Sequence, residues 1–216
     1  MTTAELVFWA IIILNVLVSY KGFNDASFFR KNEFHIGSIK TGEKYRLITS
    51  GFLHADLMHL LFNMLTFYFF GPTVLAILGV WGMLIIYFGS LIFGSLLTLY
   101  MYKNDYGYRA VGASGAVTGI IFSAILFNPD ANLYLFFALP IPAYLFGIGY
   151  LFYSIYGMKT KNDNIGHTAH FGGAIAGYLL TLVLMPQLLW YSTKMVILLA
   201  IPILVLFYLI RTNRLK

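Results

Sequence analysis

The sequence contains no cysteine, which excludes disulfide bonds and thiolate chemistry. Charged residues are also scarce: they make up 10% of the 216 residues, against about 25% in soluble globular chains. Hydrophobic residues account for 60%, and the mean hydropathy is +0.80. A water-soluble fold of this length has no interior large enough for that much apolar surface, whereas a chain in a lipid bilayer must expose it. The composition therefore predicts a polytopic, multi-pass membrane protein.

Acidic residues are fewer than basic ones: the chain has eight Asp and Glu and 14 Lys and Arg, which gives a net charge of +6. The basic residues lie in loops between apolar runs, and such loops in membrane proteins usually face anionic lipid. We therefore expect the lipid bilayer as a partner and no nucleic acid.

Seven apolar runs are candidate membrane spans, each of which needs about 20 apolar residues in a helix. The first has Glu5 near its start where a signal peptide has a basic segment, so we interpret it as a retained helix and not as a signal peptide. The fourth is short and begins at Ser114, so we expect its first turn inside the bilayer beside a water-filled cavity. The runs, which predict an all-α fold, are residues 4–20, 57–79, 80–102, 114–128, 135–157, 167–187 and 189–210.

The segment 21–56 differs from a plain linker, because it combines six of the 14 basic residues with apolar and aromatic side chains such as Phe28 and Phe29. A linker would not need these apolar residues. We expect a folded loop that rests on the membrane interface.

Polar and ionisable side chains at membrane depth are costly and tend to be functional. Here they stand at the starts of the second, fourth and sixth apolar runs. Even-numbered spans cross the membrane in the same direction, so these three helix starts share one side. The residues are His54, His59, Asn63, Ser114, His167 and His170.

Ser114 stands in the sequence Gly112-Ala113-Ser114-Gly115, at the expected N-terminus of a helix. Glycines allow close approach of another backbone, and a helix N-terminus offers unpaired N–H groups to a developing oxyanion. The serine is a candidate nucleophile. The alternative is a helix N-cap, a common role for serine.

His170 is followed on the same helical face by Gly173 and Gly177, a pattern that allows close helix packing in lipid. The fourth run carries its own pair, Gly115 and Gly119. Facing glycine seams would bring Ser114 and His170 within hydrogen-bonding reach, as base-activated nucleophilic catalysis needs. The alternative for the histidine is an interfacial position.

All Asp and Glu residues lie in loops or at span edges, and Asp163, the acid that precedes His170, is interpreted as a solvated loop residue. The sequence therefore favours a Ser–His dyad without a carboxylate, in contrast to the usual triad.

His59 and Asn63 are four residues apart, share a helix face and are suitable donors to an oxyanion. Alternatively they form a structural polar pair. His54 lies off that face and is expected to brace the loop.

The four histidines on this side also allow a zinc site, and His167-x-x-His170 has a plausible ligand spacing. No carboxylate or thiolate completes the ligand set. We therefore expect no metal and no cofactor.

Three motifs in order resemble the rhomboid family of intramembrane serine proteases. They are His59-Leu60-Leu61-Phe62-Asn63, Gly112-Ala113-Ser114-Gly115, and Ala169-His170 with Gly173 and Gly177. Tyr45-Arg46 resembles the aromatic-Arg pair of the family's first loop. The resemblance covers roughly residues 5–187. It implies a six-helix core in residues 1–187, with an additional transmembrane helix and basic tail in residues 188–216.

The resemblance implies that Ser114 attacks the scissile peptide bond, that His170 is the general base, and that the Ser114 N–H, His59 and Asn63 form the oxyanion hole. It implies single-span membrane proteins as substrates, cut in or near the transmembrane segment. Two features depart from the family. Thr118 stands where an aromatic residue often stacks on the histidine, and the second span has no late acidic residue.

The resemblance also implies a plasma (inner) membrane protein with its active site on the extracytoplasmic side. The charge distribution predicts the reverse: the active-site side and the C-terminus hold 13 Lys and Arg, and the other side has only Lys194. Two other functions stay open. One is a non-catalytic rhomboid-like protein that binds transmembrane helices, and the other is a histidine-based metal-dependent membrane enzyme or transporter.

Overall fold

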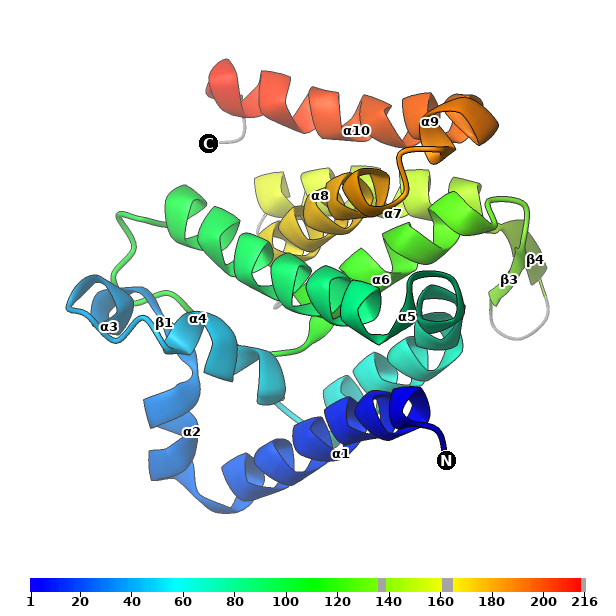
Figure 1. Ribbon diagram of the computed structural model, residues 1–216. Coiled ribbons are helices and arrows are strands. Elements are labelled where there is room, and N and C mark those ends of the chain that lie inside the picture. The colour runs from blue at the N-terminus through cyan, green and yellow to red at the C-terminus, as the bar shows by residue number, and fades with distance from the viewer. Residues whose placement is uncertain (136–138, 161–164, 215–216) are drawn as a thin grey trace.

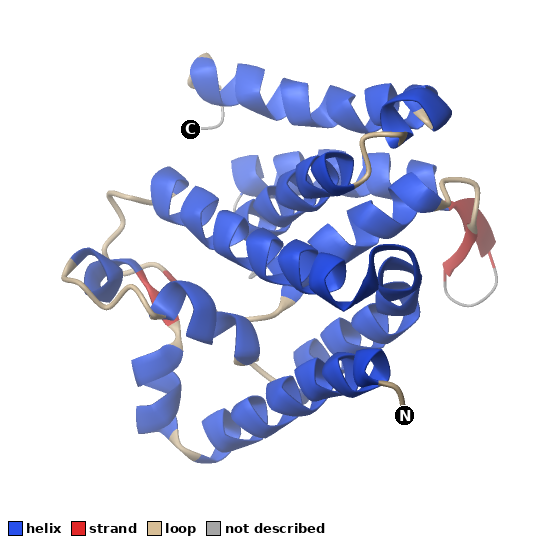
Figure 2. Cartoon of the chain, in the orientation of Figure 1, coloured by secondary structure: helices blue, strands red, loops and turns tan. Residues whose placement is uncertain are grey.

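The computed structural model describes residues 1–135, 139–160 and 165–214, and they form a helical bundle (Figures 1 and 2). The long helices are α1 (Thr3–Asn24), α5 (Leu57–Met101), α6 (Ser114–Phe127), α7 (Ala143–Thr160), α8 (His167–Leu184) and α10 (Thr193–Arg211). Short helices are α2 (Ala26–Asn32), α3 (Ile36–Lys40), α4 (Arg46–Thr49), the 3₁₀ turn η1 (Ser50–Phe52) and α9 (Leu188–Tyr191). The strands are β1 (Phe34–His35), β2 (Arg109–Ala110), β3 (Asn132–Leu135) and β4 (Leu139–Pro142).

Four of these helices, α1, α5, α8 and α10, are long and apolar enough to cross a membrane. The chain is therefore an all-α polytopic membrane protein, as its composition predicts. α5 has 45 residues, and at 1.5 Å per residue it is about twice as long as one bilayer crossing needs. Gly79 interrupts it with φ +67°, a backbone conformation that glycine adopts without steric cost. The two predicted spans 57–79 and 80–102 are the two halves on either side of this break.

Two predicted span starts are wrong. The run 135–157 does not begin as a helix, because Leu135 ends β3, residues 139–142 form β4, and α7 starts only at Ala143. Pro140 and Pro142 lack a backbone N–H and so disfavour a helix interior there. The run 189–210 also starts late: α9 and a turn precede α10, which begins at Thr193.

The first loop is folded, as predicted, and it is tied to the loop before Ser114. β1 pairs antiparallel with β2, with Phe34 opposite Ala110 and His35 opposite Arg109. Burial and the nearby Arg109 guanidinium lower the pKa of His35. The position of the first loop at the membrane interface stays a prediction.

α6 lies at the centre of the bundle, with every residue from Gly115 to Leu126 buried. Glycines let α8 approach it closely. A Cβ on Gly173 would lie 2.0 Å from the Gly115 carbonyl oxygen, and one on Gly177 would lie 2.3 Å from the Gly119 carbonyl oxygen. These distances leave no room for any side chain, so the two backbones are in direct contact.

Candidate active site

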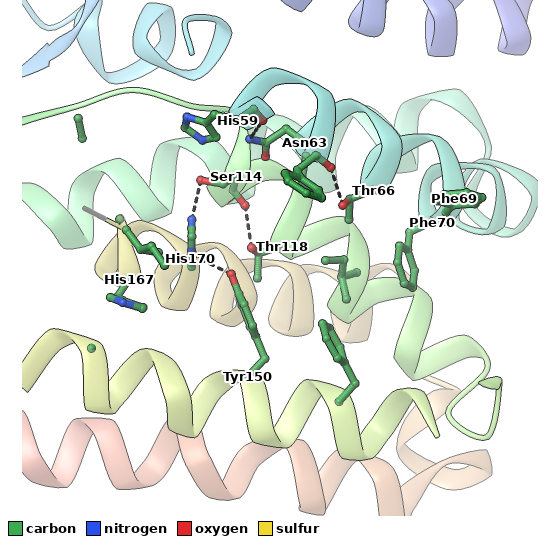
Figure 3. Close-up of a pocket in the computed structure, with 18 of the residues that line it drawn as sticks. His59, Asn63, Thr66, Phe69, Phe70, Ser114, Thr118, Tyr150, His167 and His170 are labelled. Atoms are coloured by element: carbon green, nitrogen blue, oxygen red, sulfur yellow. Dashed lines mark hydrogen bonds between the residues drawn. The ribbon is translucent and has the colours of Figure 1, made fainter. Parts of the chain in front are cut away.

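Ser114 and His170 meet at the start of two helices. Ser114 is the first residue of α6, and His170 lies in the first turn of α8. The Ser114 Oγ and the His170 Nε2 are 2.6 Å apart, a short hydrogen bond (Figure 3). Both residues line a cavity of about 1410 Å³. The glycine seam between α6 and α8 brings these side chains together across 56 residues of sequence.

Gly112 allows the turn that leads into α6. Its φ is +129°, and a Cβ there would lie 2.7 Å from the His59 Cε1. Its N–H donates to the Ser50 carbonyl oxygen at 3.0 Å, which joins the turn to the first loop. Only glycine fits both the backbone angle and the imidazole placed over it.

His59 and Asn63 lie on α5 and line the same cavity as the dyad (Figure 3). The Asn63 amide donates to the His59 carbonyl oxygen at 3.0 Å, which leaves its second N–H for another acceptor. The Ala55 N–H donates to the His59 Nδ1 over a long distance, 3.5 Å. That contact favours the tautomer with the proton on Nε2, the ring atom beside Gly112.

His54 is fully buried and does not line the cavity. The Ser19 hydroxyl donates to the Phe52 carbonyl oxygen at 3.0 Å and accepts from the His54 Nδ1 at 2.8 Å. The His54 Nε2 then accepts the Ala113 N–H at 3.4 Å. His54 thus links the residue before Ser114 to α1, and its role in bracing the loop stays a prediction.

Arg46 is buried in the first loop, away from the cavity. Its Nε donates to Glu43 at 2.6 Å, and its Nη1 donates to the carbonyl oxygens of Arg30 at 2.7 Å and Glu33 at 2.9 Å. The guanidinium therefore organises the loop backbone, because it joins three separate points of the segment.

His167 begins α8 and packs against α7. A Cβ on Gly157 would lie 2.1 Å from the His167 Nε2, so the ring fills the space above that glycine. Its ring is nearly perpendicular to that of His170, with centroids 6.3 Å apart. Within the described ranges, no three His, Cys, Asp or Glu side chains are grouped to hold a metal ion. Asp163 lies outside the described residues.

One residue of the site was missed by sequence reasoning. The Tyr150 hydroxyl, from α7, lies 2.7 Å from the His170 Nδ1 (Figure 3). Sequence alone offered no signal, because Tyr150 stands among several aromatic residues of an apolar helix.

The cavity extends from the dyad between the first half of α5 and α7. On α5 its wall has a helical spacing and mixes apolar with hydroxyl side chains: Phe62, Thr66, Phe69 and Thr73. At its other end lie Asn128 and Asn132, near the β3–β4 hairpin. The site is a long, partly polar channel in an otherwise apolar bundle.

Fold and site together define a multi-pass membrane protein with a hydrogen-bonded Ser–His pair in an internal cavity. A family model described as the Rhomboid domain matches residues 41–187. The chain therefore belongs to the rhomboid family.

Three relatives illustrate the match. "RHOMBOID-like protein 12, mitochondrial" of Arabidopsis thaliana is 35% identical over 176 residues, which cover 74% of this chain and 52% of that protein. "Putative rhomboid protease YdcA" of Bacillus subtilis is 35% identical over 150 residues, 66% of this chain and 68% of that protein. "Rhomboid protein 1, mitochondrial" of Saccharomyces cerevisiae is 29% identical over 157 residues, 71% of this chain and 43% of that protein. The chain spans about half the length of the plant and yeast relatives.

Proposed function

We propose that this chain is an intramembrane serine endopeptidase that cleaves single-span membrane proteins in or near their transmembrane segment. The observation that carries the proposal is the 2.6 Å contact between the Ser114 Oγ and the His170 Nε2 inside the cavity. A serine that only caps its helix would need no imidazole in this position.

In the proposed reaction the Ser114 Oγ attacks the scissile carbonyl carbon while His170 takes the hydroxyl proton at Nε2. Negative charge develops on the carbonyl oxygen. The proposed oxyanion donors are the Ser114 backbone N–H at the start of α6, the His59 Nε2–H and the free Asn63 amide N–H. His170 then protonates the leaving amine, and it later activates the water that hydrolyses the acyl-enzyme.

The channel between α5 and α7 suits a substrate that arrives from the lipid. A transmembrane helix hides its carbonyl groups in its own hydrogen bonds, so it must unwind locally before the serine can reach one. The Thr66 and Thr73 hydroxyls line the channel and give an unwound backbone polar partners. We therefore expect substrates with glycine or proline near the cleaved bond, since these residues weaken a helix.

A fluorophosphonate probe and a model transmembrane substrate test the proposal. We expect the probe to label the wild-type protein in membranes and the wild type to cleave the substrate, and we expect Ser114→Ala to lose both activities. Ser27→Ala is the matched control, because Ser27 is an exposed serine of α2 outside the cavity. Equal cleavage by wild type and Ser114→Ala would overturn the proposal. Binding of the substrate without labelling or cleavage would favour a helix-binding protein, and loss of activity with a chelator would favour a metal enzyme.

We also propose the plasma (inner) membrane as the location, with Ser114 facing the extracytoplasmic side. Because the chain has no native cysteine, single introduced cysteines report the orientation. An impermeant maleimide is expected to label Lys40→Cys in intact cells, since Lys40 is an exposed residue at the end of α3. Tyr191→Cys, at the opposite end of α8 from His170 and 87% exposed, is expected to be labelled only after lysis. Labelling of Tyr191→Cys in intact cells, with Lys40→Cys labelled only after lysis, would contradict this orientation.

A further inference from the structure

A catalytic imidazole needs a partner on its second nitrogen, which selects the tautomer and holds the ring in place. In a triad that partner is a carboxylate. Among the residues that the structure describes, two acids line the cavity, and both have other contacts: Asp56 accepts the His59 backbone N–H at 2.8 Å, and Asp105 accepts the Gly107 N–H at 3.2 Å. In the described part of the chain, the second nitrogen of His170 lies beside a phenol.

The contact between Tyr150 and His170 combines two geometric features. The Tyr150 hydroxyl oxygen lies 2.7 Å from the His170 Nδ1, which is a short hydrogen bond. The two rings are also nearly parallel, with an interplanar angle of 22° and centroids 6.0 Å apart. The phenol therefore restrains both the direction of the Nδ1 atom and the plane of the imidazole.

We infer that Tyr150 is the third, positioning member of the catalytic group, an inference that rests on the proposed protease function. For His170 to accept the Ser114 proton, its Nε2 must be unprotonated. The neutral imidazole then carries its proton on Nδ1. The Tyr150 oxygen accepts that N–H, so the phenol stabilises the one tautomer in which His170 is a base.

Thr118 fits the same arrangement. It stands where the family often has an aromatic residue, and its hydroxyl donates to the Ser114 carbonyl oxygen at 2.7 Å. The phenol of Tyr150 also interacts with the Thr118 side chain. A small side chain at position 118 thus leaves room for an aromatic ring that comes from α7 instead of α6. Two lines of hydrogen bonds start at Ser114: its hydroxyl contacts His170, which contacts Tyr150, and its carbonyl oxygen accepts from Thr118.

Tyr150 belongs to α7, so its hydrogen bond links His170 to one wall of the channel. α7 borders the cavity, while Ser114 and His170 lie on α6 and α8. A 2.7 Å hydrogen bond does not survive an outward displacement of α7 by about 1 Å, because a 3.6 Å contact is no longer a hydrogen bond. The dyad is therefore aligned when α7 is seated against the bundle.

The test compares Tyr150→Phe with the wild type. This variant keeps the ring but removes the hydroxyl. We expect kcat to fall about tenfold with KM unchanged, because one neutral hydrogen bond is lost and each 1.36 kcal/mol changes a rate tenfold. The rate of Ser114 labelling by a fluorophosphonate should fall by the same factor, since activation of the serine does not depend on the substrate. Tyr156→Phe is the control: it makes the same change on the same helix at a residue 57% exposed.

The outcomes separate this inference from the function on which it rests. If the wild type is labelled and Tyr150→Phe is labelled at the same rate, the positioning role is wrong while the protease function stands. If Tyr150→Phe raises KM or lowers the melting temperature without slowing labelling, Tyr150 supports the channel wall only, and the inference is likewise wrong. An unlabelled, inactive wild type would instead overturn the proposed function itself.

Discussion

At the scale of single residues, the site depends on a glycine as much as on its reactive side chains. Gly112 combines φ +129° with an imidazole packed over its Cα, so that a methyl group there would lie 2.7 Å from the His59 Cε1. Gly42 offers a comparison within the same chain, because its φ is +117° and a Cβ added there would have no atom within 4 Å. Substitutions at the two positions therefore separate the effect of backbone strain from the effect of a clash with His59.

We therefore expect Gly112→Ala to lose about 100-fold in activity, since a displacement of a catalytic group by about 1 Å costs that much. Gly42→Ala should keep its activity. Both variants should lose about 1 kcal/mol or more in unfolding free energy from the backbone strain. Substrate cleavage and thermal unfolding in detergent measure the two effects. Equal activity of the two variants would contradict a role for His59 above Gly112.

The candidate residues and the Ser114–His170 pair could be predicted from the sequence, but the partners Tyr150 and Ala113 could not. Polar residues in apolar runs stand out against their neighbours, so Ser114, His170, His59 and Asn63 were recognisable as candidates. The loop-bracing role expected for His54 stays a prediction, which its hydrogen bond to Ala113 supports. Tyr150 gave no such signal, because a tyrosine in an aromatic-rich helix looks like packing until its hydroxyl is seen beside the His170 Nδ1.

At the scale of helices and strands, apolar run length predicted the spans where nothing interrupts the helix. The break at Gly79 and the start of α6 at Ser114 agree with the predicted boundaries. Run length failed at the start of the run 135–157, where β3 pairs with β4, because hydropathy does not distinguish an apolar strand from an apolar helix. The short β1–β2 pairing was also beyond prediction, because two-residue strands leave no periodic pattern.

Helix packing depends on the glycine seam, which the spacing of Gly173 and Gly177 predicted. Ordinary contacts between a carbon and a carbonyl oxygen are about 3.3 Å or longer, whereas a Cβ on Gly173 would lie 2.0 Å from the Gly115 oxygen. Gly173→Ala is thus expected to separate α6 from α8, to break the Ser114–His170 hydrogen bond and to cost about 1 to 3 kcal/mol. Fluorophosphonate labelling and thermal unfolding in micelles report both effects.

The control for this change is Gly149→Ala on α7, where an added Cβ would have no atom within 4 Å. It should label normally and be as stable as the wild type or more so, because alanine favours a helix by up to about 1 kcal/mol over glycine. Normal labelling of Gly173→Ala would show that the seam is not what aligns the dyad.

At the scale of the whole molecule, α10, the helix of the seventh apolar run, packs into the bundle and supports the channel wall at α7. α10 lies beside α7 at the edge of the bundle (Figure 1). Leu199 is fully buried and contacts the α7 surface at Gly147, and the Tyr178 hydroxyl of α8 donates to the Val196 carbonyl oxygen at 2.9 Å. The division into a core of residues 1–187 and an added segment 188–216 stays a prediction about folding units.

Leu199→Ala and Leu204→Ala test how far α10 is integrated. Leu199 is fully buried, whereas Leu204 is 65% exposed on the same helix. We expect Leu199→Ala to lower the unfolding free energy by about 2 kcal/mol, because it leaves a cavity behind α7, and Leu204→Ala to change it little. Reversible unfolding of both variants in mixed micelles gives the comparison. Equal stability would mean that α10 is a separate anchor.

The sequence by itself determined the class of protein, the position of most apolar helices and the residue types available for chemistry. These follow from composition and local spacing, since the bilayer selects apolar helices whatever their order in space. The spacing of the glycines also predicted that Ser114 and His170 lie close together, and the structure gives the distance between them, 2.6 Å. Only the tertiary structure decided the other contacts: His170 with Tyr150 across 20 residues, and His54 with Ala113 across 59. These contacts depend on how loops and neighbouring helices pack, and no local spacing in the sequence encodes that packing.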